Sequence, residues 1–151
     1  MQDFFKRYIP EFVYGAVDGT VTTFAVVAAS AGAGISSSVI LILGIANLIA
    51  DGFSMGSSAY LAASAEHEES VRDTQKRSSP KIIGVVTFLA FVVVGSVPVL
   101  PYLIDVIANL KAPNMVLFYV SSALTAATFL AIGFIKGKVS KQSPWQSAGI
   151  T

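Results

Sequence analysis

Long apolar blocks separated by short polar segments dominate the sequence, and the apolar residues do not alternate at the period of a half-buried strand or helix. A helix of about 20 apolar residues crosses the hydrocarbon core of a bilayer, and four blocks are long enough. Helices are expected because a single helix satisfies its own backbone, whereas strands need a closed barrel. The pattern predicts an all-α, polytopic membrane protein with a single transmembrane domain over residues 1–151. The four expected spans cover about residues 12–33, 38–65, 82–104 and 116–135.

The segments between the blocks set the expected connections. The turn GAGISSS (residues 32–38) is short and uncharged, so the first two spans are expected to form an antiparallel hairpin. Residues 66–81 form the expected linker between the second and third spans. Pro98 and Pro101 should kink or end the third span, because proline lacks a backbone N–H. The first dozen residues are expected to form a short interfacial segment at the membrane edge.

Composition and charge support this class and predict an orientation. Hydrophobic residues make up 54% of the chain and charged residues 13%, whereas a soluble domain carries about 25% charged residues. Cytosolic loops of membrane proteins carry an excess of lysine and arginine. One side of the spans carries Lys111 alone, so both termini and the 66–81 linker are predicted to face the cytosol. The nine basic residues on the cytosolic side are Lys6, Arg7, Arg72, Lys76, Arg77, Lys81, Lys136, Lys138 and Lys141.

Two residue types that build many catalytic and metal centres are scarce. The chain has no cysteine, which excludes a disulfide framework, a thiolate metal site and a redox motif. Its one histidine, His67, excludes a histidine-rich site within a single chain. We interpret the protein as neither an enzyme nor a nucleic-acid-binding protein, and expect no resident cofactor.

Two carboxylates, Asp18 and Asp51, lie inside predicted spans, and no lysine or arginine lies within any of the four. A charged side chain at the bilayer centre costs about 2.5–3.5 kcal/mol on insertion scales. Each carboxyl group must therefore be protonated, reach water or meet a cation. A carboxyl group without a partner in the membrane is by default a functional-site hypothesis.

Helical spacing gathers the polar side chains of the second span on one face. If this helix continues past the membrane, Glu66 and Glu69 lie on or beside the same face, and Glu69 is about 27 Å from Asp51 at helical rise. The face would then carry carboxylates from the cytosolic surface to mid-membrane. Its members within an arc of about 100° at helical spacing are Asn47, Asp51, Ser54, Met55 and Ser58.

A structural interpretation stays open for part of this set. Serine, threonine and asparagine in membrane helices often hydrogen-bond to a neighbouring helix for packing alone. Glu66 and Glu69 can equally belong to the solvated end of a cytosolic helix. The first span carries a comparable face of small and polar residues suited to close helix approach: Glu11, Gly15, Asp18, Thr22, Ala25, Ala29 and Gly32.

The candidate ligands favour a particular class of metal ion. Oxygen ligands with one thioether, Met55, suit Fe²⁺ or Mn²⁺ better than Zn²⁺ or Cu⁺, which prefer histidine and cysteine. One chain offers Asp18, Asp51, Met55 and Asn47, fewer ligands than such ions take, and a two-fold homodimer would double that set at the shared axis. Burial favours the neutral form of a carboxyl group, so metal binding would release protons. Metal–proton exchange is the coupling that this predicts.

Two stretches resemble the vacuolar iron transporter family. Its first two helices are similar to FVYGAVDGTVTTFAVVAASAGAG (residues 12–34) and VILILGIANLIADGFSMGSSAYLAASAE (residues 39–66). The specific pieces are DG-x-VTT and NLIADGFSM-x-x-x-x-YL taken together. The similarity covers about residues 11–70 strongly and continues weakly through FIKGKVSKQSPWQSA (residues 134–148).

The resemblance implies export of cytosolic Fe²⁺, often also of Mn²⁺, by proton antiport through a homodimer in the lipid bilayer. It implies a metal path along the dimer interface, lined by Asp18 of the first helix and Met55 of the second. Asp51 and Asn47 occupy adjoining positions. The expected host membrane is a bacterial plasma membrane, or the vacuolar membrane in a eukaryote.

The sequence departs from the family pattern in two places. Many members insert a glutamate-rich, helical metal-binding domain between the second and third helices, whereas about 16 residues, 66–81, fill that gap here. Glu66 and Glu69 correspond less closely to acidic residues at the family's cytosolic entrance. Members usually have a fifth helix, and Thr151 falls where SPWQSAGIT would lead into it. We therefore expect a short form of the family or an incomplete sequence.

Two aspartates within the membrane also occur in proteins of other functional classes. An intramembrane aspartyl protease also uses two membrane aspartates, but tyrosine precedes one of them and GxGD contains the other. Here Val17 precedes Asp18 and Ala50 precedes Asp51, which disfavours that reaction. A non-transporting structural or regulatory subunit and a passive divalent-cation channel stay open as alternatives. The need for a proton gradient would distinguish the channel from the antiporter.

Overall fold

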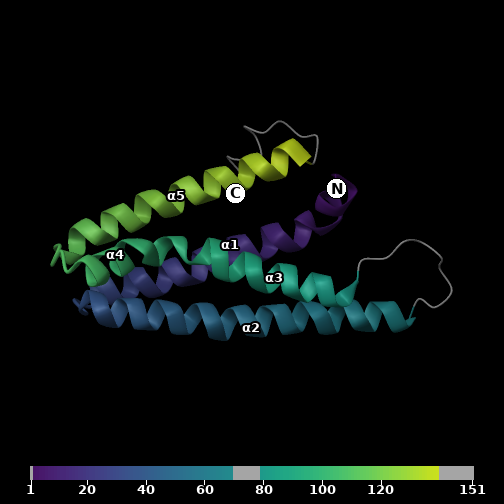
Figure 1. Ribbon diagram of the computed structural model, residues 1–151, viewed down its shortest axis with the longest axis horizontal. Coiled ribbons are helices and arrows are strands. Elements are labelled where there is room, and N and C mark those ends of the chain that lie inside the picture. The colour runs from purple at the N-terminus through teal and green to yellow at the C-terminus, as the bar shows by residue number, and fades with distance from the viewer. Residues whose placement is uncertain (1, 70–78, 140–151) are drawn as a thin grey trace.

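The computed structural model describes residues 2–69 and 79–139, with side chains for residues 7–66 and 79–137 (Figure 1). These residues form a bundle of long helices joined by short connections. The α1–α2 turn and the α4–α5 loop lie at one end of the bundle, and the start of α1 lies at the other (Figure 1). The helices are α1 (Gln2–Gly32), α2 (Ser37–Glu69), α3 (Pro80–Gly95), the 3₁₀ helix η1 (Val97–Val99), α4 (Leu100–Ala108) and α5 (Asn114–Val139).

Within residues 2–69 and 79–139, four helical segments are long and apolar enough to cross a membrane, which confirms the all-α fold and the four spans expected from the sequence. Three of them extend one to four residues beyond both ends of the expected span, whereas the first begins five residues earlier and ends one residue earlier than expected. The protein is therefore a multi-pass membrane protein. The segments are Arg7–Gly32, Ser37–Glu66, Pro80–Ala108 and Asn114–Gly137.

The third span is interrupted where the prolines predicted a kink. Helix α3 ends at Gly95, and the Ser96 N–H still donates to the Val92 carbonyl at 3.1 Å. The chain then tightens into η1, where the Val99 N–H donates to the Ser96 carbonyl at 3.0 Å, and continues as α4. Pro98 and Pro101 each fall in the first turn of a new helix, where a missing N–H is tolerated. The span is thus kinked without being ended.

The segment expected at the membrane edge is part of a longer helix, and its interfacial position stays a prediction. Helix α1 begins at Gln2 and runs through Pro10 without a break, so residues 2–12 belong to the same helix as the first span. Tyr8 is buried, and its hydroxyl accepts a hydrogen bond from the Ser79 N–H at 3.3 Å. This packing next to the start of α3 gives the segment a tertiary partner that the sequence pattern does not reveal.

Helices α1 and α3 approach each other through glycine. A Cβ atom on Gly15 would lie 2.5 Å from the Thr87 carbonyl oxygen, and one on Gly19 would lie 2.5 Å from that of Phe91. On the opposite helix, a Cβ on Gly95 would lie 2.8 Å from the Gly19 carbonyl. Such contacts are possible because glycine has no side chain at these positions, and small residues at helix interfaces are common in membrane bundles. They fix the rotation of α1, and with it the direction of the neighbouring Asp18.

Gly19→Ala is expected to lower the stability of the detergent-solubilised protein by about 1–3 kcal/mol, the usual range for overpacking. The added methyl meets backbone atoms of Phe91, which cannot turn away, so α1 and α3 must separate. Gly32→Ala is the control, because nothing lies within 4 Å of its added Cβ. Thermal unfolding followed by size-exclusion chromatography measures both. Equal melting temperatures for the two variants would show that the close approach contributes nothing.

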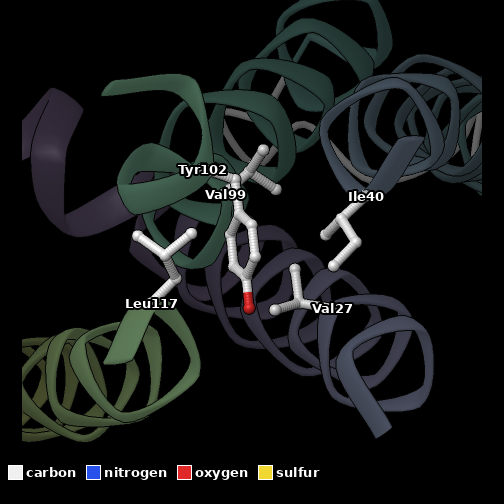
Figure 2. Packing of buried hydrophobic residues seen from close by; sticks show 5 residues of the cluster. All are labelled: Val27, Ile40, Val99, Tyr102 and Leu117. Atoms are coloured by element: carbon white, nitrogen blue, oxygen red, sulfur yellow. The ribbon is translucent and has the colours of Figure 1, made fainter. Parts of the chain in front are cut away.

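Apolar side chains from five elements close the end of the bundle near the α1–α2 turn. Figure 2 shows Val27, Ile40, Val99, Tyr102 and Leu117 converging from α1, α2, η1, α4 and α5. Polar contacts join the loops at the same end. The Asn114 amide donates to the Ile35 carbonyl at 2.9 Å, and the buried Asp105 carboxylate accepts from the Ala112 N–H at 2.9 Å. This closed end leaves the candidate site further along α1 and α2.

Candidate metal-binding cleft

An open cleft of about 480 Å³ lies between α1 and α2 within their membrane-spanning parts. It brings together three residues predicted from the sequence: Asp18 of α1, and Asp51 and Met55 of α2. Asp18 and Met55 are half-buried, and Asp51 is exposed. The remaining lining residues are Tyr14, Ser54, Ser58, Ala59 and Ala62.

Helical spacing explains why these side chains meet. Asp51, Met55 and Ser58 recur at intervals of four and three residues, so they share one face of α2. Serine and alanine occupy most of the remaining α2 positions and leave room beside the carboxylates. The cleft therefore has carboxyl oxygens and a thioether within one helical turn and small side chains along the rest of its length.

Tyr14 lines the cleft although the sequence did not single it out. It lies four residues before Asp18 and therefore one turn away on the same face of α1. That spacing is the signal in the sequence that places Tyr14 beside Asp18. Glu11, seven residues before Asp18, has one carboxylate oxygen that is buried without a hydrogen-bond partner among the described residues.

Asn47 lies outside the cleft. Its amide nitrogen donates to the Thr23 hydroxyl at 3.3 Å, which joins α2 to α1 one turn from Asp51. The side chain is half-buried at this helix contact. Asn47 thus makes a packing contact between helices, as the structural interpretation of these polar residues allows. It lies next to the cleft without lining it.

Of the two acidic residues predicted further along α2, the structure describes the side chain of Glu66. Helix α2 continues to Glu69, as predicted for a helix that extends past the membrane. Glu66 is exposed four residues beyond Ala62, the last α2 residue of the cleft, and so continues the same face. The Glu69 side chain lies outside the described residues. A line of acidic positions from the end of α2 to Asp51 remains a prediction.

The part of the chain that the structure describes does not by itself supply six ligands for a metal ion in the cleft. Among the residues that the structure describes, no three histidine, cysteine, aspartate or glutamate side chains form a group that could hold a metal. The cleft supplies two carboxylates, one thioether and hydroxyl groups. Additional ligands would have to come from water or from a second copy.

Four apolar spans among the described residues, with two carboxyl groups in one cleft between α1 and α2, define a polytopic membrane protein. The sequence model of the VIT family matches residues 9–79 and 67–151, and the chain belongs to that family. This confirms the family resemblance derived from the first two helices.

Curated relatives carry matching names. A protein named vacuolar iron transporter from Toxoplasma gondii (strain ATCC 50861 / VEG) is 46% identical over 61 residues, which are 40% of this chain and 20% of the relative. Vacuolar iron transporter 1 of Arabidopsis thaliana is 38% identical over 77 residues, 51% of this chain and 30% of the relative. The matches thus span less than a third of these relatives' length. Both relatives are named as transporters, which agrees with the expectation that the chain is not an enzyme.

Proposed function

We propose that the protein carries a divalent metal ion, Fe²⁺ or Mn²⁺, out of the cytosol in exchange for protons. The observation that carries this proposal is the meeting of Asp18, Asp51 and Met55 in one cleft within the membrane. Its membership in a family with relatives named vacuolar iron transporter supports a metal as the cargo. Such export fits a bacterial plasma membrane or, in a eukaryote, a vacuolar membrane, since both routes lead away from the cytosol.

The chemistry of the cleft supports competition between metal and protons. Two carboxylates that share one cleft repel each other when both are charged, and a dication or protons relieve that repulsion. A metal ion binds the ionised carboxylates and displaces their protons. Protons arriving from the opposite side then displace the metal. Met55 adds a soft ligand, which favours Fe²⁺ and Mn²⁺ over Mg²⁺ and Ca²⁺.

A homodimer would complete the ligand set. In our proposal two copies face each other across a two-fold axis next to the cleft, so that each Asp18, Asp51 and Met55 is present twice. The exposure of Asp51 supports this arrangement, because a carboxylate facing lipid in the isolated chain would be costly. Asn47, Glu66 and Glu69 are proposed to assist at the neighbouring levels of α2.

Uptake of Fe²⁺ into proteoliposomes, measured with and without a pH gradient, tests the function. Antiport predicts that a gradient of protons drives metal accumulation against its own gradient. Uptake that is indifferent to the pH gradient would instead identify a passive channel. A folded dimer that moves no metal in either condition would identify a subunit without transport activity and would overturn the proposal.

A further inference from the structure

A second hollow lies on another side of α2, between α2 and α3, which run side by side (Figure 1). Its volume is about 540 Å³, and none of its lining residues lines the acidic cleft. Its lining residues run along the two helices from Phe53 and Phe88, further into the membrane, to Leu61 and Lys81, nearer its surface. We call this hollow the α2–α3 groove.

The floor of the α2–α3 groove is backbone. A Cβ on Gly84 would lie 2.8 Å from the Gly56 carbonyl oxygen, and one on Gly56 would lie 2.9 Å from the Gly84 carbonyl oxygen. The helices therefore touch at a level where neither has a side chain to fill the surface, and larger neighbours stand on both sides. Phe53 is 70% exposed and Leu61 is 64% exposed, so the walls are open to the bilayer.

The length and position of the groove match one leaflet. Lys81 is the second residue of the third span, which starts at Pro80, so it lies at the membrane surface. Seven residues separate Lys81 from Phe88, or about 10 Å at helical rise. One leaflet of the hydrocarbon core is about 15 Å thick. The groove therefore runs from the surface through most of the leaflet predicted to face the cytosol.

Charge is confined to one end of the groove. Lys81 is exposed and is the only charged residue among the described residues that line it. Basic positions between membrane helices at the cytosolic surface are typical sites for anionic lipid headgroups. Among the described residues, no carboxylate lines the groove, so an uncharged occupant would cover the Lys81 ammonium without supplying a counterion, which is costly. A lipid phosphate supplies the negative charge that pairs with Lys81 at the membrane surface.

We propose that the α2–α3 groove binds one anionic phospholipid. An acyl chain lies over the glycine floor towards Phe53 and Phe88, and the phosphate pairs with the Lys81 ammonium. The bound lipid would cover the α2–α3 contact on the side away from the acidic cleft. This lipid site shares no residue with the metal cleft, so lipid binding and the proposed transport activity can be tested separately.

Native mass spectrometry of the purified protein tests this site with two probes that share their acyl chains, phosphatidylglycerol and phosphatidylcholine. Phosphatidylglycerol is expected to remain bound several-fold more than phosphatidylcholine, because the choline cation offsets the phosphate of the latter and a net ion pair of about 1 kcal/mol gives roughly a fivefold preference. Lys81→Gln should remove the preference. Lys111→Gln, which neutralises an exposed lysine at the opposite end of the spans, should keep it. Equal retention of both lipids by the unmodified protein, or an equal loss in both variants, would overturn the proposal.

A second pair of variants tests the acyl-chain part of the groove. Val85→Trp is expected to fill the groove and reduce retention of both lipids, because Val85 lines it and is 56% exposed. Val93→Trp is the control on the same helix, since Val93 is 64% exposed and does not line the groove. If Val85→Trp instead dissociates dimers without changing lipid retention, the groove is an interface between copies and the lipid proposal is wrong.

Discussion

Asp51→Asn is expected to lose metal uptake in proteoliposomes by more than about tenfold, since even losing an outer-shell partner of a metal ligand lowers affinity by about 10–100-fold. Asparagine keeps the shape and one neutral oxygen but removes the negative charge that a dication and a proton would share. The protein should still fold, because replacing a carboxylate in a membrane span with a neutral amide removes a desolvation cost. Uptake of Fe²⁺ driven by a pH gradient is the measurement, and Asp18→Asn should behave in the same way.

Asp105→Asn is the matched control for that experiment. It makes the same chemical change in the third span, outside the cleft, and it keeps an oxygen that can accept the Ala112 N–H bond. We expect this variant to transport at close to the unmodified rate. Full uptake by Asp51→Asn beside a folded control would remove that carboxylate from the proposed path. Loss of uptake in all three variants would point to a general defect and not to the cleft.

Lowering the pH is expected to weaken Mn²⁺ binding to the solubilised protein by up to about tenfold per pH unit for each proton that the metal displaces, by mass action. Metal binding needs ionised carboxylates, and protons compete for the same oxygens, so affinity falls as the solution becomes more acidic. Electron paramagnetic resonance of free Mn²⁺, measured at a series of pH values, gives the dissociation constant and the slope.

Single-site variants test whether the carboxyl groups of the cleft cause this pH dependence of Mn²⁺ binding. Asp18→Asn leaves fewer carboxylates to titrate, so its remaining binding should depend less steeply on pH. Ser57→Ala, which changes α2 away from the cleft, should keep the original slope. A binding constant that stays unchanged across the pH range would contradict competition between metal and protons, and would leave a passive path as the better account of any flux.

Much of the architecture could be predicted from the sequence, because a bilayer allows few structures. Spans of about 20 apolar residues must be helical to satisfy their own backbone groups. The kink in the third span also followed from Pro98 and Pro101, although proline alone did not show that the helix would resume as α4. The sequence did not predict that α1 would run unbroken from Gln2 through Pro10, nor that Tyr8 would be buried and bond to Ser79.

The sequence likewise predicted part of the candidate site, and helix packing decided the rest. Periodicity alone placed Asp51 and Met55 on one face of α2, and the cost of a carboxylate in lipid singled out Asp18 and Asp51. Periodicity cannot say which face of one helix meets which face of the next. Asn47 shares the α2 face but bonds to Thr23, whereas Tyr14 was passed over and lines the cleft.

The sequence by itself determined the number of spans, their helical form and the residues whose charge needs an explanation in the membrane. These properties depend on single helices in lipid, and each helix carries the information in its own residues. The tertiary structure decided that Asp18 and Asp51 share one cleft. That outcome depends on the rotation of α1, which Gly15 and Gly19 set by their contact with α3. A contact between surfaces distant in sequence leaves no period along the chain, so only the packed structure reveals it.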